Sequence, residues 1–340
     1  MDGDGGEAVD LRGRGATGID LPAVLTRLDG EPSEQRAAVS RIRTAIDERD
    51  GATGCAPTVP KLRSLLEQPE IDFRETVAAC LADLAAEAPT DVAPSTGSIV
   101  AVAREEPDRP MTGELLRCLA AVAAERPDVV VDHAAAIADV LERRSGYDTD
   151  GLDALAHVSR VDPTALEPAV SVLKAALSAA PAENGRPALR ALGRLARSEG
   201  DPGSLEFVSH AAALVDHGNP DVRHEAIGCL GDVAHHDPAA VESVTAELGA
   251  ALSCDDPDTR AAAAVTIARI AARTETTVGP VRRQLLALLA DDHAHVRANA
   301  CVALGHGGVE AAEPRLADLA SRDPAPNVRD RASWAAGQLS

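Results

Sequence analysis

The sequence predicts an all-α protein in which about nine helix pairs stack into a solenoid. Three observations predict this fold: few aromatic residues, prolines at a nearly constant spacing, and an arginine-containing segment that recurs at the same spacing. Aromatic residues make up 1% of the 340 residues, whereas hydrophobic residues make up 45%. A core of Ala, Leu and Val suits thin, closely packed helices, and Ala is the best helix former.

The prolines that follow apolar helical runs give one measure of the repeat. Their spacings are 38, 36, 39 and 36 residues, and they are Pro89, Pro127, Pro163, Pro202 and Pro238. Toward the C-terminus, four similar segments align on arginines spaced by 37, 37 and 32 residues, namely Arg223, Arg260, Arg297 and Arg329. A constant period indicates a repeat architecture, in which each unit buries its apolar face only by stacking on its neighbours.

Each repeat is expected to contain two helices. A turn with Pro and Asp or Asn opens a helix, since Pro is tolerated in the first turn and Asp or Asn can cap it. After Val222, small and apolar residues follow at offsets of 4, 7, 8 and 11, and they are Ala226, Cys229, Leu230 and Val233. These offsets form one helical face. A short break then leads to a second amphipathic helix, for example over residues 238–253.

The predicted boundaries make residues 19–340 a single solenoid. Its units are 19–50, 56–88, 90–126, 127–162, 163–200, 202–236, 238–273, 278–307 and 308–340. Residues 1–18 are rich in Gly and charge, so we expect a disordered tail. Pro94 and the segment 146–151 are the expected irregular places, because Pro and Gly interrupt helices.

The aligned segments resemble HEAT repeats, in particular the HEAT-like repeats named after phycobilisome lyases. They read NPDVRHEAIGCLG (219–231), HAHVRANACVALG (293–305) and APNVRDRASWAAG (325–337). The resemblance is clear over residues 200–340 and weaker upstream. It implies a superhelix whose second helices line a concave binding surface. The alternative, an armadillo repeat, would need a third short helix in each unit and a longer period.

The net charge of −21 argues against nucleic acids and anionic membranes as partners, because both would be repelled. Lys61 and Lys174 are the only lysines, and this composition resembles the proteins of halophilic archaea. A GC-rich genome would also favour Arg over Lys. No apolar run reaches 18 residues, the N-terminus does not read as a secretory signal, and the six cysteines show no CxxC spacing. We therefore expect a cytoplasmic protein with free thiols.

The resemblance implies a structural ladder between adjacent repeats. Its predicted members are Arg223, Arg260, Arg297, Arg329, Asp221 and Asp258. Arginines that bound anions in a groove would be the functional alternative. By helical offset, the residues expected on the concave, protein-binding face are His224, Glu225, Asp232, Asn299, Arg331 and Trp334. For Trp334 the choice lies between a binding anchor and a cap over the last repeat.

The histidines are the candidate metal ligands of the sequence. The pair His224–Glu225 resembles the His-Glu pairs of deoxyhypusine hydroxylase, a di-iron HEAT-repeat enzyme, but the chain has no second such pair. His293 and His295 could hold a metal with His306, although solvated roles are favoured. We therefore predict no metal and no cofactor. The expected function is a non-catalytic scaffold that binds protein partners. The alternatives are a lyase-like or metal-dependent accessory factor, and a nucleic-acid-binding protein like the HEAT-like DNA glycosylases.

Overall fold

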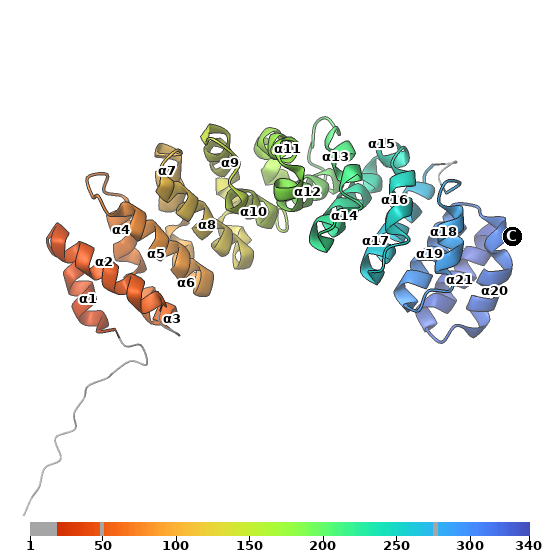
Figure 1. Cartoon of the computed structure of the whole chain (residues 1–340), viewed down its shortest axis with the longest axis horizontal. Coiled ribbons are helices and arrows are strands. Elements are labelled where there is room, and N and C mark those ends of the chain that lie inside the picture. The colour runs from red at the N-terminus through yellow and green to blue at the C-terminus, as the bar shows by residue number, and fades with distance from the viewer. Residues whose placement is uncertain (1–18, 48–50, 275–277) are drawn as a thin grey trace, which may run out of the picture. The chain divides into compact units, whose positions relative to one another are not determined.

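The computed structural model describes residues 19–47, 51–274 and 278–340, and this part of the chain contains helices and no strand (Figure 1). The chain divides into two compact units between Val130 and Val131 in the sequence. We call them unit 1, up to Val130, and unit 2, Val131–Ser340. The predicted tail, residues 1–18, lies outside the described residues.

The described residues of unit 1 form three helix pairs. The first helices of these pairs are α1 (Leu21–Leu28), then α3 (Gly51–Cys55) with η1 (Ala56–Thr58) and α4 (Val59–Leu66), then α6 (Pro89–Val92) with η2 (Ala93–Ser95) and α7 (Thr96–Glu105). The second helices are α2 (Pro32–Asp47), α5 (Arg74–Glu87) and α8 (Pro110–Glu125), and η3 (Pro127–Val129) follows. Each second helix packs on the next one.

Six more pairs are formed by residues 131–274 and 278–340 of unit 2. Their first helices are η4 (Val131–His133) with α9 (Ala134–Arg143), η5 (Pro163–Ala169) with α11 (Val170–Ala179), α13 (Phe207–Ala213), α15 (Pro238–Glu242) with α16 (Thr245–Ala251), α18 (Arg282–Leu288), and η6 (Glu310–Ala312) with α20 (Glu313–Arg322). Their second helices are α10 (Thr149–Val158), α12 (Pro181–Arg197), α14 (Pro220–His236), α17 (Pro257–Ala271), α19 (Ala294–His306) and α21 (Pro326–Leu339).

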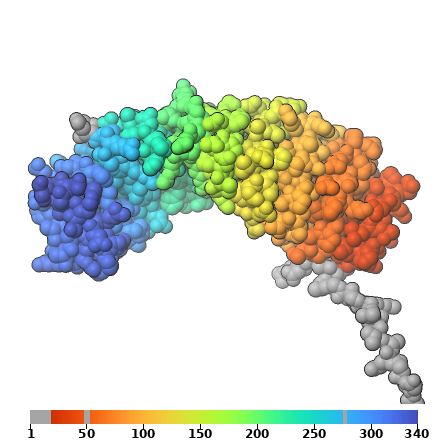
Figure 2. Space-filling view, turned by 180° about the vertical axis from the view of Figure 1, so that it is seen from behind, coloured from red at the N-terminus to blue at the C-terminus, as the bar shows by residue number. Residues whose placement is uncertain are grey.

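The prediction of an all-α solenoid is confirmed, and the described residues form nine helix pairs in the predicted order. Within unit 2, successive repeats lie beside their sequence neighbours, as the order of colours in Figure 2 shows. The second helices of unit 2 lie together on the side toward which this unit curves (Figure 1). We call their exposed surface the inner face.

Prolines interrupt three of the first helices in the described residues. Pro57, Pro94 and Pro168 each lie in a 3₁₀ segment, because proline lacks the N–H that would continue an α-helix. Pro94 was an expected irregular place, and Gly146 is another: its φ of +95° allows the turn between α9 and α10. The short helices α3, α6 and α15 give three of the repeats a third helix, as an armadillo repeat would have. The repeat period nevertheless stays near the value of about 37 residues seen in the sequence.

Glycines of the recurring Leu-Gly step let neighbouring second helices approach closely. A Cβ placed on Gly193 would lie 2.9 Å from Cys229 Cα, and one on Gly305 would lie 2.9 Å from Ala335 Cα. Cysteines fill small spaces in the same interfaces, as their apolar character allows. Cys80, Cys118 and Cys229 are all buried.

Candidate functional site

The four recurring arginines bind the backbone of the turn that precedes their own helix. Nη1 of each arginine donates to the carbonyl oxygen six residues earlier: Arg223 to His217, Arg260 to Cys254, Arg297 to Asp291, and Arg329 to Asp323, at 2.7–2.8 Å. Each arginine thereby ties its helix to the turn that precedes it. The recurrence of the arginine in the sequence follows from this structural need.

Two of these arginines also pair with a carboxylate in the next repeat. Arg260 contacts Asp291 at 2.8 Å, and Arg297 contacts Asp323 at 2.8 Å. Asp221 and Asp258, the expected ladder partners, are not the carboxylates that these arginines contact within residues 19–47, 51–274 and 278–340. Each lies two residues before its arginine on the same helix, and residues two apart do not face each other. Asp258 lies 3.4 Å from His295 instead.

Three residues expected on the protein-binding face are engaged with neighbouring helices. His224 lies 3.0 Å from Asp256, the cap of α17. Glu225 forms an ion pair with Arg190 of α12. Asp232 lies 3.1 Å from Arg197 and 3.8 Å from Arg269, which flank it on α12 and α17. These contacts link successive repeats, so the three side chains are only partly available to a partner.

Asp232 belongs to a row of ionisable side chains that crosses the inner face. The row has one member on each of five successive second helices, directly after the small residue of the repeat signature. Its members are spaced by 37, 38, 37 and 37 residues: His157, Arg194, Asp232, Arg269 and His306. We call this set the inner row. Sequence reasoning placed only Asp232 on this face and considered His306 as a metal ligand, although the spacing could have revealed the whole row.

Electrostatics make the inner row differ from the rest of the chain. Burial, with Arg160, Arg190 and Arg194 nearby, lowers the pKa of His157 below its ordinary 6.5, although Asp153 opposes the shift. Burial also lowers the pKa of His306 below 6.5. Both histidines are therefore neutral at pH 7, while Arg194, Asp232 and Arg269 are charged. The row carries a small positive charge on a strongly acidic protein.

Two expected residues, Asn299 and Arg331, lie together at one hollow of the inner face. The hollow has a volume of about 270 Å³ and lies between α17, α19 and α21. Its apolar part is formed by Val265, Ala268, Ala272 and Val302, and its polar part by Arg269, Asn299, His306 and Arg331. Asn299 also donates to the Ala261 carbonyl at 3.2 Å, which fixes it between two repeats.

Trp334 lies beside this hollow. Its ring meets that of His306 edge to face, with centroids 4.7 Å apart. Trp334 is 37% exposed, and Val161 is the other large exposed hydrophobic residue in the part of the chain that the structure describes. An exposed tryptophan that adjoins an apolar hollow is the arrangement found at binding anchors.

The other histidine candidates do not converge. His293 lies 3.2 Å from Asp291, and His295 lies 3.4 Å from Asp258, so each has its own carboxylate. His306 packs on Trp334 instead of approaching them. Within the described ranges, no three His, Cys, Asp or Glu side chains are placed together as metal ligands.

Comparison with known proteins supports the fold. Residues 282–340 match the family model described as HEAT repeats. This match supports a HEAT-repeat family. A crystal structure of an engineered protein from the Northeast Structural Genomics Consortium is similar, with a TM-score of 0.65 over 94% of this chain and 99% of that chain. The two sequences are 17% identical, so the similarity shows the fold alone, a helical repeat scaffold. No curated protein matches the sequence.

The helices of the described residues are too short or too polar to cross a membrane.

Proposed function

We propose that this helical repeat scaffold is non-catalytic and binds a protein partner through the inner face of unit 2. The observation that carries the proposal is the apolar hollow between α17, α19 and α21, which opens beside the exposed Trp334. Its 270 Å³ is below the range of about 300–1,000 Å³ that is usual for small-molecule sites. One apolar side chain of a partner suits this size better than a cofactor does.

The charged groups around the hollow indicate the chemistry next to that side chain. Arg269 and Arg331 supply two cations, and Arg269 is partly offset by Asp232 at 3.8 Å. Asn299 and His306 add neutral hydrogen-bonding groups. We infer that the partner presents an apolar side chain followed by a carboxylate. This differs from the basic segment that the net charge of −21 alone would favour, because contacts depend on the local charges.

We also propose that this interaction takes place in a cytoplasm of high salt. The excess of 54 acidic over 33 basic residues, with two lysines, supports a halophilic source and a cytoplasm of high salt. Long-range attraction is screened there within about 3 Å at 1 M salt. An apolar anchor keeps its strength under such conditions, which is why we place the main contact in the hollow and not at the ion pairs.

A charge placed in the hollow tests the proposal. Val302→Arg on α19 should abolish capture of the partner from a native lysate at molar salt, because the apolar site would be filled and charged. Ala317→Arg adds the same side chain to an exposed position on α20 and is the matched control. A protein retained by the wild type and by Ala317→Arg, but not by Val302→Arg, supports the proposal. Equal retention by both variants contradicts it.

A further inference from the structure

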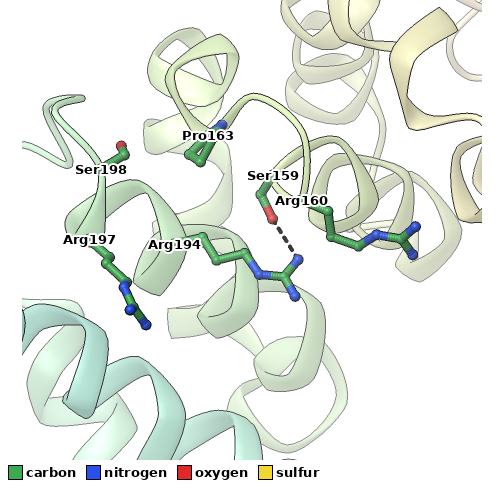
Figure 3. Close-up of a pocket in the computed structure, with 6 residues that line it drawn as sticks. All are labelled: Ser159, Arg160, Pro163, Arg194, Arg197 and Ser198. Atoms are coloured by element: carbon green, nitrogen blue, oxygen red, sulfur yellow. Dashed lines mark hydrogen bonds between the residues drawn. The ribbon is translucent and has the colours of Figure 1, made fainter.

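A second hollow of unit 2 lies where α10 and α12 end. Its volume is about 360 Å³, and it is lined by Ser159, Arg160, Pro163, Arg194, Arg197 and Ser198 (Figure 3). None of the lining residues is acidic. In Figure 3 the Arg194 side chain extends toward Ser159, with Arg160 beyond it and Arg197 on the other side. The hollow thus presents three arginine side chains to solvent.

Two of the three guanidinium groups have no carboxylate within 4 Å among the described residues. Arg194 donates to the Ala156 carbonyl and to Ser159 Oγ, each at 3.2 Å, and both acceptors are neutral. Arg160 lies 3.4 Å from Nδ1 of His157, which is also neutral. Acidic residues outnumber basic ones by 54 to 33, so two adjacent arginines without an acid are not a consequence of composition.

The nearby carboxylates are engaged elsewhere. Asp162 accepts hydrogen bonds from the backbone N–H groups of Thr164 and Ala165, which caps η5. Glu225 pairs with Arg190, and Asp232 is shared by Arg197 and Arg269. Only Nη1 of Arg194 takes part in the hydrogen bonds above, and its other N–H groups remain open to an added acceptor.

The internal repeat shows what is missing at this hollow. Arg269 occupies the same position on α17 as Arg194 on α12: each donates Nη1 to a carbonyl 38 residues earlier, Gly231 and Ala156 respectively. The residue after Gly231 is Asp232, which lies 3.8 Å from Arg269. The residue after Ala156 is His157. A carboxylate therefore faces the arginine in one repeat, and a neutral imidazole takes its place in the other.

We propose that this hollow binds a phosphomonoester group, held by Arg160 and Arg194. Two guanidinium groups without carboxylates match the two charges of a phosphomonoester, and their planar forks suit its oxygens. A single carboxylate would balance only one of the two arginine charges. A polyanion such as nucleic acid would be repelled by the net charge of −21, so the ligand is an isolated phosphate group.

Calorimetric titration of the purified chain tests this inference, which does not depend on the proposed function. Inorganic phosphate, added at pH 7.5 and constant ionic strength, should bind saturably at one site. His157→Asp restores the carboxylate found in the other repeat and should weaken binding at least about tenfold, since a charge-assisted contact is lost. In His157→Asn the asparagine has nearly the same shape as the aspartate but carries no charge, so this variant should bind phosphate as the wild type does.

Two further variants separate a loss of phosphate binding from a loss of folding. Arg160 is exposed, so Arg160→Ala should fold normally and bind more weakly, whereas Arg322→Ala on α20 should change nothing. Circular dichroism checks that each variant is folded. Tighter binding of N-acetyl-phosphoserine amide than of phosphate would assign the site to a phosphorylated side chain, and equal binding would assign it to free phosphate. Absence of saturable binding with both ligands, or equal affinity in His157→Asp and His157→Asn, overturns the proposal.

Discussion

Arg297 on α19 and Asp323, in the turn between α20 and α21, form a bidentate ion pair that joins the last two repeats. Nε and Nη2 of Arg297 donate to the two carboxylate oxygens of Asp323 at 2.8 and 2.9 Å. The Arg297 side chain is 11% exposed and that of Asp323 is 2% exposed. The N–H of Ala325 donates a third hydrogen bond, to Asp323 Oδ1, which fixes the turn before α21. The pair thus holds a turn, a helix and the neighbouring repeat together.

Loss of this carboxylate should destabilise unit 2. We expect Asp323→Asn to lower the free energy of unfolding by about 2 kcal/mol or more, because Arg297 would stay largely buried without its counter-charge. Chemical denaturation at pH 7 measures the change. Asp318→Asn is the control, since Asp318 is 60% exposed and pairs with Arg322 on the surface. A surface pair contributes about 0–1 kcal/mol, so similar effects of the two variants would contradict the expectation.

The effect of Asp323→Asn should also depend on pH. Arg297 lowers the pKa of Asp323 below its ordinary 3.8. The stability that Asp323 adds is therefore fully present above pH 3.8 and is lost as the pH falls through the lowered pKa. The wild type and Asp323→Asn should therefore differ in free energy of unfolding by a constant amount above pH 3.8. This difference should become smaller only below pH 3.8, which chemical denaturation at a series of pH values measures.

Arg223 lacks the carboxylate that Arg260 and Arg297 have, and Cys254 is the reason. Asp291 and Asp323 occupy the position six residues before the next arginine of the repeat, and Cys254 occupies that position before Arg260. Nε of Arg223 is buried without a hydrogen-bond partner in the described part of the chain. Cys254→Asp should therefore stabilise the protein, by about 1 kcal/mol, through a new charge-assisted bond.

Thermal unfolding of Cys254→Asp and of Cys254→Ser measures this gain. Serine removes the thiol without adding a charge, so it separates loss of the cysteine from gain of the ion pair. A melting temperature of Cys254→Asp at or below that of Cys254→Ser would refute the assignment.

The sequence was sufficient to predict the helix pairs, because the positions that define them repeat. Prolines, caps and the Leu-Gly step recur at nearly constant spacing, and each meets a local need of the backbone. The division at Val130 was not predicted, since packing between repeats decides it and no composition change marks it. The resemblance to HEAT repeats assigned Asp221 and Asp258 to the ladder, whereas Arg260 and Arg297 pair with Asp291 and Asp323 of the next repeat.

The candidate surface was only partly predicted, for a related reason. Helical offsets identified Asn299 and Arg331, which depend only on which side of a helix faces outward. The inner row was missed because its residue type changes from repeat to repeat, from His157 to Arg194 to Asp232. The side chains at these positions differ in charge, although they occupy equivalent places on successive helices. An alignment by residue type therefore does not detect them.

The glycines at the end of the repeat signature, Gly305 and Gly337, should differ in their tolerance of a side chain. A Cβ on Gly305 would meet Ala335 Cα at 2.9 Å, while a Cβ on Gly337 would meet nothing within 4 Å. Gly305→Ala should therefore destabilise the protein by about 1–3 kcal/mol through overpacking. Gly337→Ala should stabilise it by up to about 1 kcal/mol, because Ala is the better helix former.

Urea denaturation of the two variants measures both the expected loss of stability in Gly305→Ala and the expected gain in Gly337→Ala. The substitutions are chemically identical and lie at equivalent positions of neighbouring repeats, so each controls for the helix propensity of the other. Stabilisation by both substitutions would show that α19 and α21 can move apart without cost.

The contact between His306 and Trp334 should make tryptophan fluorescence sensitive to pH. Trp334 is the only tryptophan, so the emission reports this contact alone. Burial disfavours the charged imidazole and lowers the pKa of His306 below 6.5. As the pH falls, the ring gains a charge beside the indole, and the emission should change with a midpoint below pH 6.5. A fluorescence titration checks this. His306→Gln keeps a polar side chain at the position and should remove the transition, whereas a midpoint at or above pH 6.5, or a transition that persists in His306→Gln, would mean that another group is responsible.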